Sequence, residues 1–288
     1  MIPAAFEYHA PKTLRQAIST LRKYDGEARV LAGGMSLVPM MKLRLANLAA
    51  VVDLGRIKGL SFIQEVNGGL SIGPMTTHYD IESSEVVQRI SPILAEAAAL
   101  VGDVQVRNRG TIGGSVAHAD PAADLPAALL VLHAKFSIAG SARRRIVRAD
   151  RMFVDAYTSA LEEGEVIAGV HVPAMPPRTG WSYKKLANRA SRFAIVGIAT
   201  QVTTDEQGVC TRARVAITGA GPAPTRARTI ERYLTGKKLT PLNITKSATR
   251  AIAGIEFLGD VHGSPEYRKH LTMELTKQAL TEASERIR

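Results

Sequence analysis

The chain has a single cysteine, Cys210, among its 288 residues, and only 5% of its residues are aromatic. One cysteine excludes an intramolecular disulfide, and it excludes a four-thiolate iron–sulfur cluster or a cysteine-rich zinc site within this chain. No apolar run approaches the roughly 18 residues of a membrane span, and the first residues lack the basic and apolar stretches of a secretory signal. These absences predict a soluble, cytoplasmic protein with no membrane span and no metal site.

The length and the hydrophobic content indicate about two globular domains. A chain of 288 residues corresponds to about two domains of roughly 150 residues each. The hydrophobic share of 45% is ordinary for a folded protein and too high for a disordered one. The best candidate linker is the segment 173–180, which is rich in proline. We therefore expect one domain over residues 1–176 and a second over residues 177–288.

The net charge of +11 is concentrated in one part of the chain. Residues 173–253 contain 14 Lys and Arg but only 3 Asp and Glu, whereas residues 1–172 are almost balanced. A pI near 9.9 is typical of nucleic-acid binding, but this segment has few aromatics to stack bases and no nucleic-acid motif. We therefore expect no nucleic-acid partner. The basic segment is either a solvated surface or a docking surface for other proteins, and the sequence leaves both open.

Hydrophobic periodicity and turn residues predict a mixed α and β structure. Thr13 is a candidate N-cap for a helix over residues 14–21. Further helices are expected over residues 37–45, 90–101, 125–133, 225–234, 242–255 and 265–287, with Ser36 and Asp124 as N-caps of the first and third. Strands are expected over residues 29–31, 50–54, 70–73, 136–138, 145–147, 166–172, 182–186, 194–203 and 212–218. Strands followed by helices after the linker favour an α+β second domain.

Two glycine pairs are the first candidates for a binding site. Gly33-Gly34 and Gly113-Gly114 each follow an apolar or β-branched stretch and precede an apolar helix or a polar loop. A glycine pair lets backbone N–H groups converge on an anion with no Cβ in the way. Two such cradles in one domain would suit a pyrophosphate. Either pair alone is more typical of an ordinary tight turn than of a binding site.

Two other motifs point to different functions. The segment 219–224 (GAGPAP) lacks the third glycine of a dinucleotide-binding turn and the acid that should follow about 20 residues later, so we interpret it as a strand-to-helix turn. Ser115 lies near His118, Asp120 and Asp124, which keeps a serine hydrolase as an alternative. A hydrolase elbow, however, precedes a helix and has its partners far downstream, whereas these candidates crowd one expected loop. The His-x-Asp spacing of His118 and Asp120 is only weak evidence for a metal site.

Taken together, the two glycine segments resemble a specific family. The segments 32–39 (AGGMSLVP) and 111–115 (TIGGS), followed by Asp120-Pro121 and 124–126 (DLP), are similar to the FAD-binding medium subunits of the molybdenum hydroxylases. This is the xanthine dehydrogenase and aerobic carbon monoxide dehydrogenase family. The segments 6–8 (FEY), 72–77 (IGPMTT) and 183–186 (YKKL) also match, and the resemblance covers roughly the whole chain.

The resemblance implies a fold and a set of cofactor contacts. The fold class would be α+β, with a two-subdomain PCMH-type FAD-binding domain followed by a small C-terminal α+β domain of the carbon monoxide dehydrogenase flavoprotein type. FAD would lie between them, bound non-covalently, since neither glycine segment contains His, Cys or Tyr. The residues expected to contact FAD are Ala32, Gly33, Gly34, Met35, Ser36, Thr76, Thr77, Thr111, Ile112, Gly113, Gly114, Ser115, Asp124, Leu161 and Lys185.

The resemblance also implies partners. A large subunit would hold molybdopterin, a small subunit would hold two two-iron, two-sulfur clusters, and the complex would be a dimer of heterotrimers. Electrons would pass from the clusters through FAD to an external acceptor, so no catalytic acid–base residue is expected here. A flavin- or nucleotide-binding module without a redox role is the alternative. Met35 and Phe193 stand where carbon monoxide dehydrogenase chains carry His and Tyr, and Ser115 stands where Asn is common, so carbon monoxide is not implied as the substrate.

Overall fold

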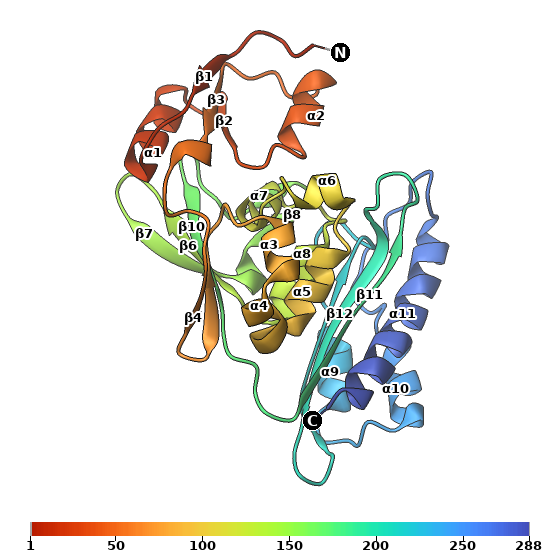
Figure 1. Ribbon diagram of the computed structural model, residues 1–288. Helices are drawn as coiled ribbons and strands as arrows, with labels where there is room; N and C mark the ends of the chain where they lie inside the picture. The colour runs from red at the N-terminus through yellow and green to blue at the C-terminus, as the bar shows by residue number, and fades with distance from the viewer. Residues whose placement is uncertain (1, 288) are drawn as a thin grey trace.

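The computed structural model describes residues 2–287, and its first part is a small parallel sheet flanked by helices (Figure 1). The three strands lie in the order β1-β3-β2, and both outer strands are parallel to β3. Thr13 accepts a hydrogen bond from the Gln16 N–H, which confirms it as an N-cap. The elements are β1 (Glu7–His9), α1 (Leu14–Lys23), β2 (Ala28–Leu31), α2 (Leu37–Lys42), β3 (Ala50–Asp53) and the 3-10 helix η1 (Leu54–Arg56).

A five-stranded antiparallel sheet in the order β4-β5-β10-β6-β7 forms the second part. Its strands are β4 (Ile63–Val66), β5 (Gly69–Ile72), β6 (Lys135–Ala139), β7 (Arg144–Arg148) and β10 (Val166–Val172). Six helices accompany the sheet: α3 (His78–Ser83), α4 (Glu85–Ile90), α5 (Pro92–Ala99), α6 (Val104–Arg107), α7 (Ile112–His118) and α8 (Asp124–Val131). A short excursion before β10 contains η2 (Ala149–Arg151), β8 (Phe153–Asp155) and β9 (Thr158–Ser159).

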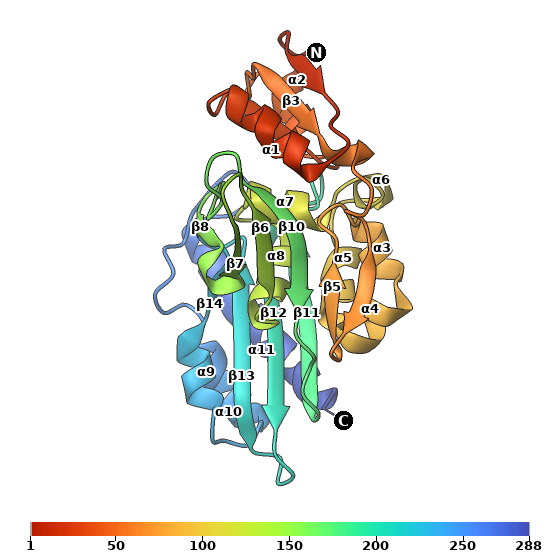
Figure 2. The same ribbon diagram turned by 90° about the vertical axis from the view of Figure 1, so that its left-hand side faces the viewer.

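The third part is a four-stranded antiparallel sheet with helices on one face (Figure 2). It is built from β11 (Thr179–Ala187), β12 (Ala194–Thr204), β13 (Cys210–Thr218), β14 (Thr225–Arg226), α9 (Arg228–Leu234), α10 (Pro241–Ala248) and α11 (Pro265–Glu285). The mixed α and β architecture predicted from the sequence is confirmed. Of the helices in residues 2–287, none combines the length and the apolar composition that crossing a bilayer requires.

This C-terminal sheet is buried on both faces, because side chains alternate between the faces along each strand. Ile198 and Val202 of β12 belong to the hydrophobic cluster that includes residues of α9, α10 and α11. Ala199 of β12 and Ala216 of β13 point the other way and join the core around α5 and α8. The third part of the chain therefore shares a core with the second, and α8 lies at their contact (Figure 1).

Several predicted helices have different bounds in the structure. The helix expected over 90–101 is α5, which begins at Pro92 after Ser91 and ends at Ala99, whereas α4, which ends at Ile90, was not predicted. The helix expected over 37–45 ends at Lys42, and that over 242–255 ends at Ala248. The helix expected from residue 225 begins only at Arg228, because Thr225 and Arg226 pair with β13 as β14 and Ala227 is the N-cap.

Two corrections concern the predicted site. Residues 112–118 are a helix with Thr111 as its N-cap, so Gly113-Gly114 lie in a first helical turn and not in a loop. Asp124 is not the N-cap of α8, which is Ala123. Asp124 instead occupies the first turn of α8 and is buried. Ser36 occupies the predicted N-cap position of α2, but its side chain makes no capping hydrogen bond.

Candidate functional site

The two glycine segments lie against each other. A Cβ on Gly33 would stand 2.0 Å from the backbone oxygen of Arg109, just before the second segment. On the other side, a Cβ on Gly114 would stand 3.6 Å from the Cβ of Ala32. Segments about eighty residues apart in sequence thus form one surface, and Gly33 is required where the two backbones meet.

The first segment presents free backbone N–H groups. Within residues 2–287, the N–H groups of residues 33–36 have no acceptor. Gly34 has a φ of +76°, which turns the chain so that successive N–H groups can face one side. The Ser36 hydroxyl is not used as a cap. Consecutive unpaired N–H groups form a concave anion site, so this segment can hold a phosphate group.

The second segment differs, because its N–H groups are already used. Ile112 donates to the Thr76 oxygen at 3.0 Å and Gly113 to the Pro74 oxygen at 2.9 Å. The Gly114 N–H donates to Thr111 Oγ1 at 3.1 Å. The second cradle of free N–H groups predicted from the sequence is therefore wrong. Gly113 is needed for packing, since its Cβ would lie 2.6 Å from Pro74. Gly114 and Ser115 are half-buried, and Gly114 leaves open space beside Ala32 of the first segment.

The side chains of Thr76 and Thr77 support this surface from within the protein. Thr76 is buried and exchanges hydrogen bonds with the backbone of Phe62, at 3.0 and 3.2 Å. Thr77 forms a capping box with Asp80 at the start of α3. The two threonines also pair with the start of α7 through the Thr77–Thr111 bridge and the Thr76 oxygen. Their side chains form hydrogen bonds within the protein, and their backbones position α7.

A buried ion pair joins the first turn of α8 to the C-terminal sheet. Lys185 Nζ lies 2.8 Å from Asp124 Oδ2 and also donates to the Leu100 oxygen at 2.8 Å. The Tyr183 hydroxyl donates to Asp124 Oδ1 at 2.7 Å. Burial raises the pKa of Asp124 to about 6, while Lys185 and Tyr183 act against that rise. Burial followed by the Asp124 charge raises the pKa of Tyr183 well above its usual value.

The C-terminal sheet also forms hydrogen bonds with the chain just before α8. Thr218 Oγ1 lies 2.8 Å from the backbone oxygens of both Pro121 and Ala123. The Gly219 N–H donates to the Pro121 oxygen at 2.8 Å, and Ala194 donates to the Ala122 oxygen at 3.3 Å. These contacts fix the start of α8 relative to β12 and β13. Tyr183 and Thr218 were not predicted as site residues. The sequence could have indicated Tyr183, because side-chain alternation along a strand places it on the same face as Lys185.

The remaining predicted residues lie at the edges of this region. Leu161 is half-buried after β9 and packs against the main core, and its own N–H and C=O make no hydrogen bond within residues 2–287. Met35 and Phe193 are 39% and 42% exposed. Met35 belongs to the segment with the free N–H groups, and its exposed apolar side chain there suits a ligand with both a phosphate and an apolar part.

The geometry does not support a serine hydrolase. Ser115 lies on α7, and no hydrogen bond joins it to His118 within the described residues. His118 instead packs against Tyr157, with ring centroids 5.2 Å apart. Burial lowers the pKa of His118 and raises that of Asp120, which leaves both groups less charged. A nucleophile needs a base within hydrogen-bond reach, and this arrangement does not provide one. Among residues 2–287, no group of three ligating side chains could hold a metal ion.

Comparisons with known proteins cover nearly the whole chain. A family described as the FAD binding domain in molybdopterin dehydrogenase matches residues 4–175, and the CO dehydrogenase flavoprotein C-terminal domain matches residues 181–283. The carbon monoxide dehydrogenase medium chain of Hydrogenophaga pseudoflava is 40% identical over 98% of both chains. The nicotine 6-hydroxylase medium subunit of Paenarthrobacter nicotinovorans is 34% identical over 98% of both chains. A solved structure of the Hydrogenophaga pseudoflava carbon monoxide dehydrogenase superposes with a TM-score of 0.97, 41% identity and full coverage of both chains.

Proposed function

Because this chain belongs to the family of FAD-binding subunits of molybdopterin dehydrogenases, we propose that it binds FAD non-covalently at the surface formed by the two glycine segments. The observation that carries this proposal is the row of free N–H groups at residues 33–36 beside Gly114. A pyrophosphate is the part of FAD that such N–H groups would bind. Bound flavin supplies the redox chemistry, and the protein supplies binding and orientation.

The other residues named by the resemblance take supporting roles in this proposal. Ala32 precedes the free N–H groups, Met35 contributes one of them, and Ser36 and Ser115 add hydroxyl donors. Thr76, Thr77, Thr111, Ile112 and Gly113 hold the second segment in place through the hydrogen bonds described above. Asp124 and Lys185 act as a buried pair that joins the two parts of the chain at the flavin, and the free backbone of Leu161 faces the cofactor.

The proposal for the whole complex follows the family. The large partner subunit would hold molybdopterin and oxidise the substrate, and the small partner would carry the two iron–sulfur clusters. This chain would receive electrons from the clusters and pass them from FAD to an external acceptor. A dimer of such heterotrimers and a cytoplasmic location stay predictions, as does the domain boundary at residues 176 and 177.

Cofactor binding is tested on the purified, FAD-loaded chain. Acid precipitation is expected to release the flavin into the supernatant, because no covalent anchor is proposed. Flavin that stays with the precipitated protein would contradict non-covalent binding. A redox role is tested in the intact complex: removing FAD should abolish reduction of the external acceptor while dithionite still reduces the iron–sulfur clusters. Acceptor reduction that continues without FAD would favour a module with no redox role.

Docking of the basic segment is tested separately. Arg228, Arg232 and Lys237 are exposed on or near α9. Charges at the rim of an interface change association rates more than affinity. We expect that reversing all three to Glu slows assembly with the partner subunits at low salt while FAD stays bound. If the variant assembles at the wild-type rate at low salt, the segment is a solvated surface only.

A further inference from the structure

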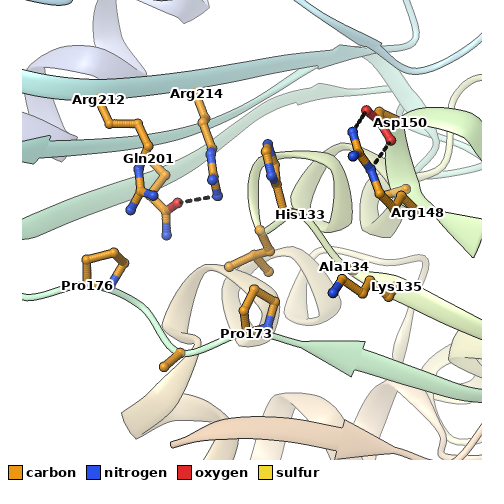
Figure 3. A pocket seen from close by; sticks show the side chains of 13 residues that line it. His133, Ala134, Lys135, Arg148, Asp150, Pro173, Pro176, Gln201, Arg212 and Arg214 are labelled. Carbon is orange, nitrogen blue, oxygen red and sulfur yellow. Dashed lines mark hydrogen bonds and ion pairs between the residues drawn. The ribbon is translucent and has the colours of Figure 1, made fainter.

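A polar cavity lies at the end of α8 that is opposite to Asp124 (Figure 3). It encloses about 350 Å³ between the end of α8, the start of β6, the segment after β7 and the proline-rich segment after β10. Its apolar base includes the buried residues Leu132, Ala134 and Ala149. A volume of this size is at the small end of the range typical of ligand pockets.

The third part of the chain contributes the polar wall. Gln201 of β12 and Arg212 and Arg214 of β13 point into the cavity (Figure 3). Arg212, Arg214 and Thr218 share one face of β13, because they are separated by even numbers of residues. Arg214 is four residues from Thr218, which binds the chain at the start of α8, so the cavity lies about 13 Å along the strand from that end of α8. The two sites are therefore separate but share one face of the sheet.

The positive charge in this cavity is not balanced. Its lining includes four cations, Lys135, Arg148, Arg212 and Arg214, and one carboxylate, Asp150. Asp150 forms an ion pair with Arg148. The other three cations form no ion pair with any residue in 2–287. Burial, with the nearby charges of Arg212 and Arg226, lowers the pKa of Arg214 to about 10. Crowding cations in a partly buried cavity costs free energy unless an anion is present.

His133 adds a neutral donor. Arg226 Nη1 lies 2.8 Å from His133 Nε2, and an arginine can only donate. Nε2 is therefore the acceptor, and the proton of the neutral ring is on Nδ1, which has no acceptor within the described residues. Burial and the charges of Arg214 and Arg226 lower the pKa of His133 to about 4. The ring stays neutral above that pH and offers one N–H group at the rim of the cavity.

One of these cations has a structural explanation. Arg214 Nη1 donates to the Val131 oxygen at 3.0 Å, so it caps the C-terminal end of α8. Arg212 and Lys135 make no such hydrogen bond, and capping therefore does not explain why they converge here. Guanidinium groups are preferred partners of phosphate because they present several donors in a fixed plane.

We propose that this cavity binds the phosphate group of a small molecule, with Arg212, Lys135 and the Gln201 amide as donors and His133 Nδ1–H at the rim. The candidate ligands are inorganic phosphate, pyrophosphate and a phosphate monoester. The chemical group that they share is a phosphate dianion. An acidic segment of a partner protein is the competing occupant, and the experiment below distinguishes it.

The test uses the FAD-loaded full-length chain, so that flavin fills its own site. Calorimetric titrations with phosphate, pyrophosphate and AMP at constant ionic strength are expected to give saturable binding of one molecule per chain. Arg212→Gln should weaken that binding at least about tenfold, because it removes a charged donor. The matched control is Lys277→Gln, which changes the same charge at an exposed position on α11 and should bind as the wild type does. Flavin absorbance should be unchanged in both variants.

The comparison among the three probes identifies the source of the phosphate. AMP binding tighter than orthophosphate would indicate a nucleotide or another monoester, and equal binding would indicate the free anion. The proposal is overturned if no probe binds saturably, or if Arg212→Gln binds as tightly as Lys277→Gln. It is also overturned if the isolated chain binds phosphate but the assembled complex does not, since a partner segment then fills the cavity.

Discussion

The two glycine pairs are alike in sequence and differ in what their backbones do. Around Gly33-Gly34 the N–H groups are free, and the chain is shaped by a positive φ and by the approach of Arg109. Around Gly113-Gly114 the N–H groups are bonded inside the protein, and glycine is needed for packing against Pro74. A glycine pair is therefore evidence of close approach, and the approaching group can be a ligand or the protein's own chain.

The largest effect should come from Gly33→Ala. Its new Cβ would meet the Arg109 backbone oxygen, which no side-chain movement can relieve. We expect loss of bound flavin and a decrease of about 3 kcal/mol in the free energy of unfolding, measured by urea denaturation. Gly140→Ala is the matched control, because its Cβ would stand no closer than 3.4 Å to any neighbouring atom, the Glu165 Cγ. Normal flavin content in Gly33→Ala would mean that the two segments need not touch.

Gly114→Val should separate flavin binding from stability. The valine would crowd Thr111 Oγ1, where a Cβ alone already stands at 2.9 Å, and would fill the space beside Ala32. We expect a folded protein, destabilised by about 2 kcal/mol, with no flavin absorbance. Gly221→Val is the control: its Cβ would stand 3.0 Å from the backbone oxygen of Glu256, but it lies in the connection between β13 and β14, which the structure has in place of the predicted strand-to-helix turn, and it should keep its flavin. Equal flavin loss in both variants would refute the proposed site.

Thr111→Val should affect mainly the second segment. The change removes the N-cap hydrogen bond to Gly114 while keeping the side chain's shape. We expect a loss of about 1 kcal/mol in unfolding free energy, the usual cost of losing a cap. Flavin affinity should decrease only to the extent that the loss of this hydrogen bond destabilises α7. If stability does not change in thermal or urea denaturation, the bond that occupies the Gly114 N–H is unimportant.

Ser36→Ala should have the smallest effect on stability and a specific effect on flavin. Its side chain makes no capping bond, so unfolding free energy should stay within about 0.5 kcal/mol of the wild type. A hydroxyl that donates to a charged phosphate contributes about 1.5 kcal/mol, so the FAD dissociation constant should rise about tenfold. Fluorescence titration of the apoprotein measures it. The opposite pattern, lower stability and normal affinity, would make Ser36 a structural residue like Thr111.

Sequence reasoning located the elements that local signals specify. The strand at 166–172 has the predicted bounds, because a β-branched run between turn residues is a strong signal. The helix α7 was missed because glycine has low helix propensity and the contacts that hold it come from Pro74 and Thr76. The two residues of β14 are a strand only through pairing with β13. Tertiary contacts decided both cases, and no local pattern reports them.

The candidate site was predictable to a similar extent. The motifs located both glycine segments, and alternation along β11 could have added Tyr183 to Lys185. The state of the N–H groups could not be predicted, because it depends on which backbone oxygens lie opposite. The sequence does carry a signal for the basic cavity: Arg212 and Arg214 are two residues apart on one strand, which places two guanidinium groups on one sheet face.

The sheet that is buried on both faces has a consequence for how the molecule melts. Ala199 and Ala216 pack into the core around α8, while Ile198 and Val202 pack into the core beneath α11. Separating the two parts would expose one complete sheet face to water. The second and third parts should therefore unfold as a single cooperative unit, with one calorimetric peak for both whose enthalpy equals the van't Hoff value. A fragment that ends in the proline-rich segment would lack the C-terminal sheet that covers α5 and α8. Co-expression of the two halves should restore this packing without a peptide bond between them.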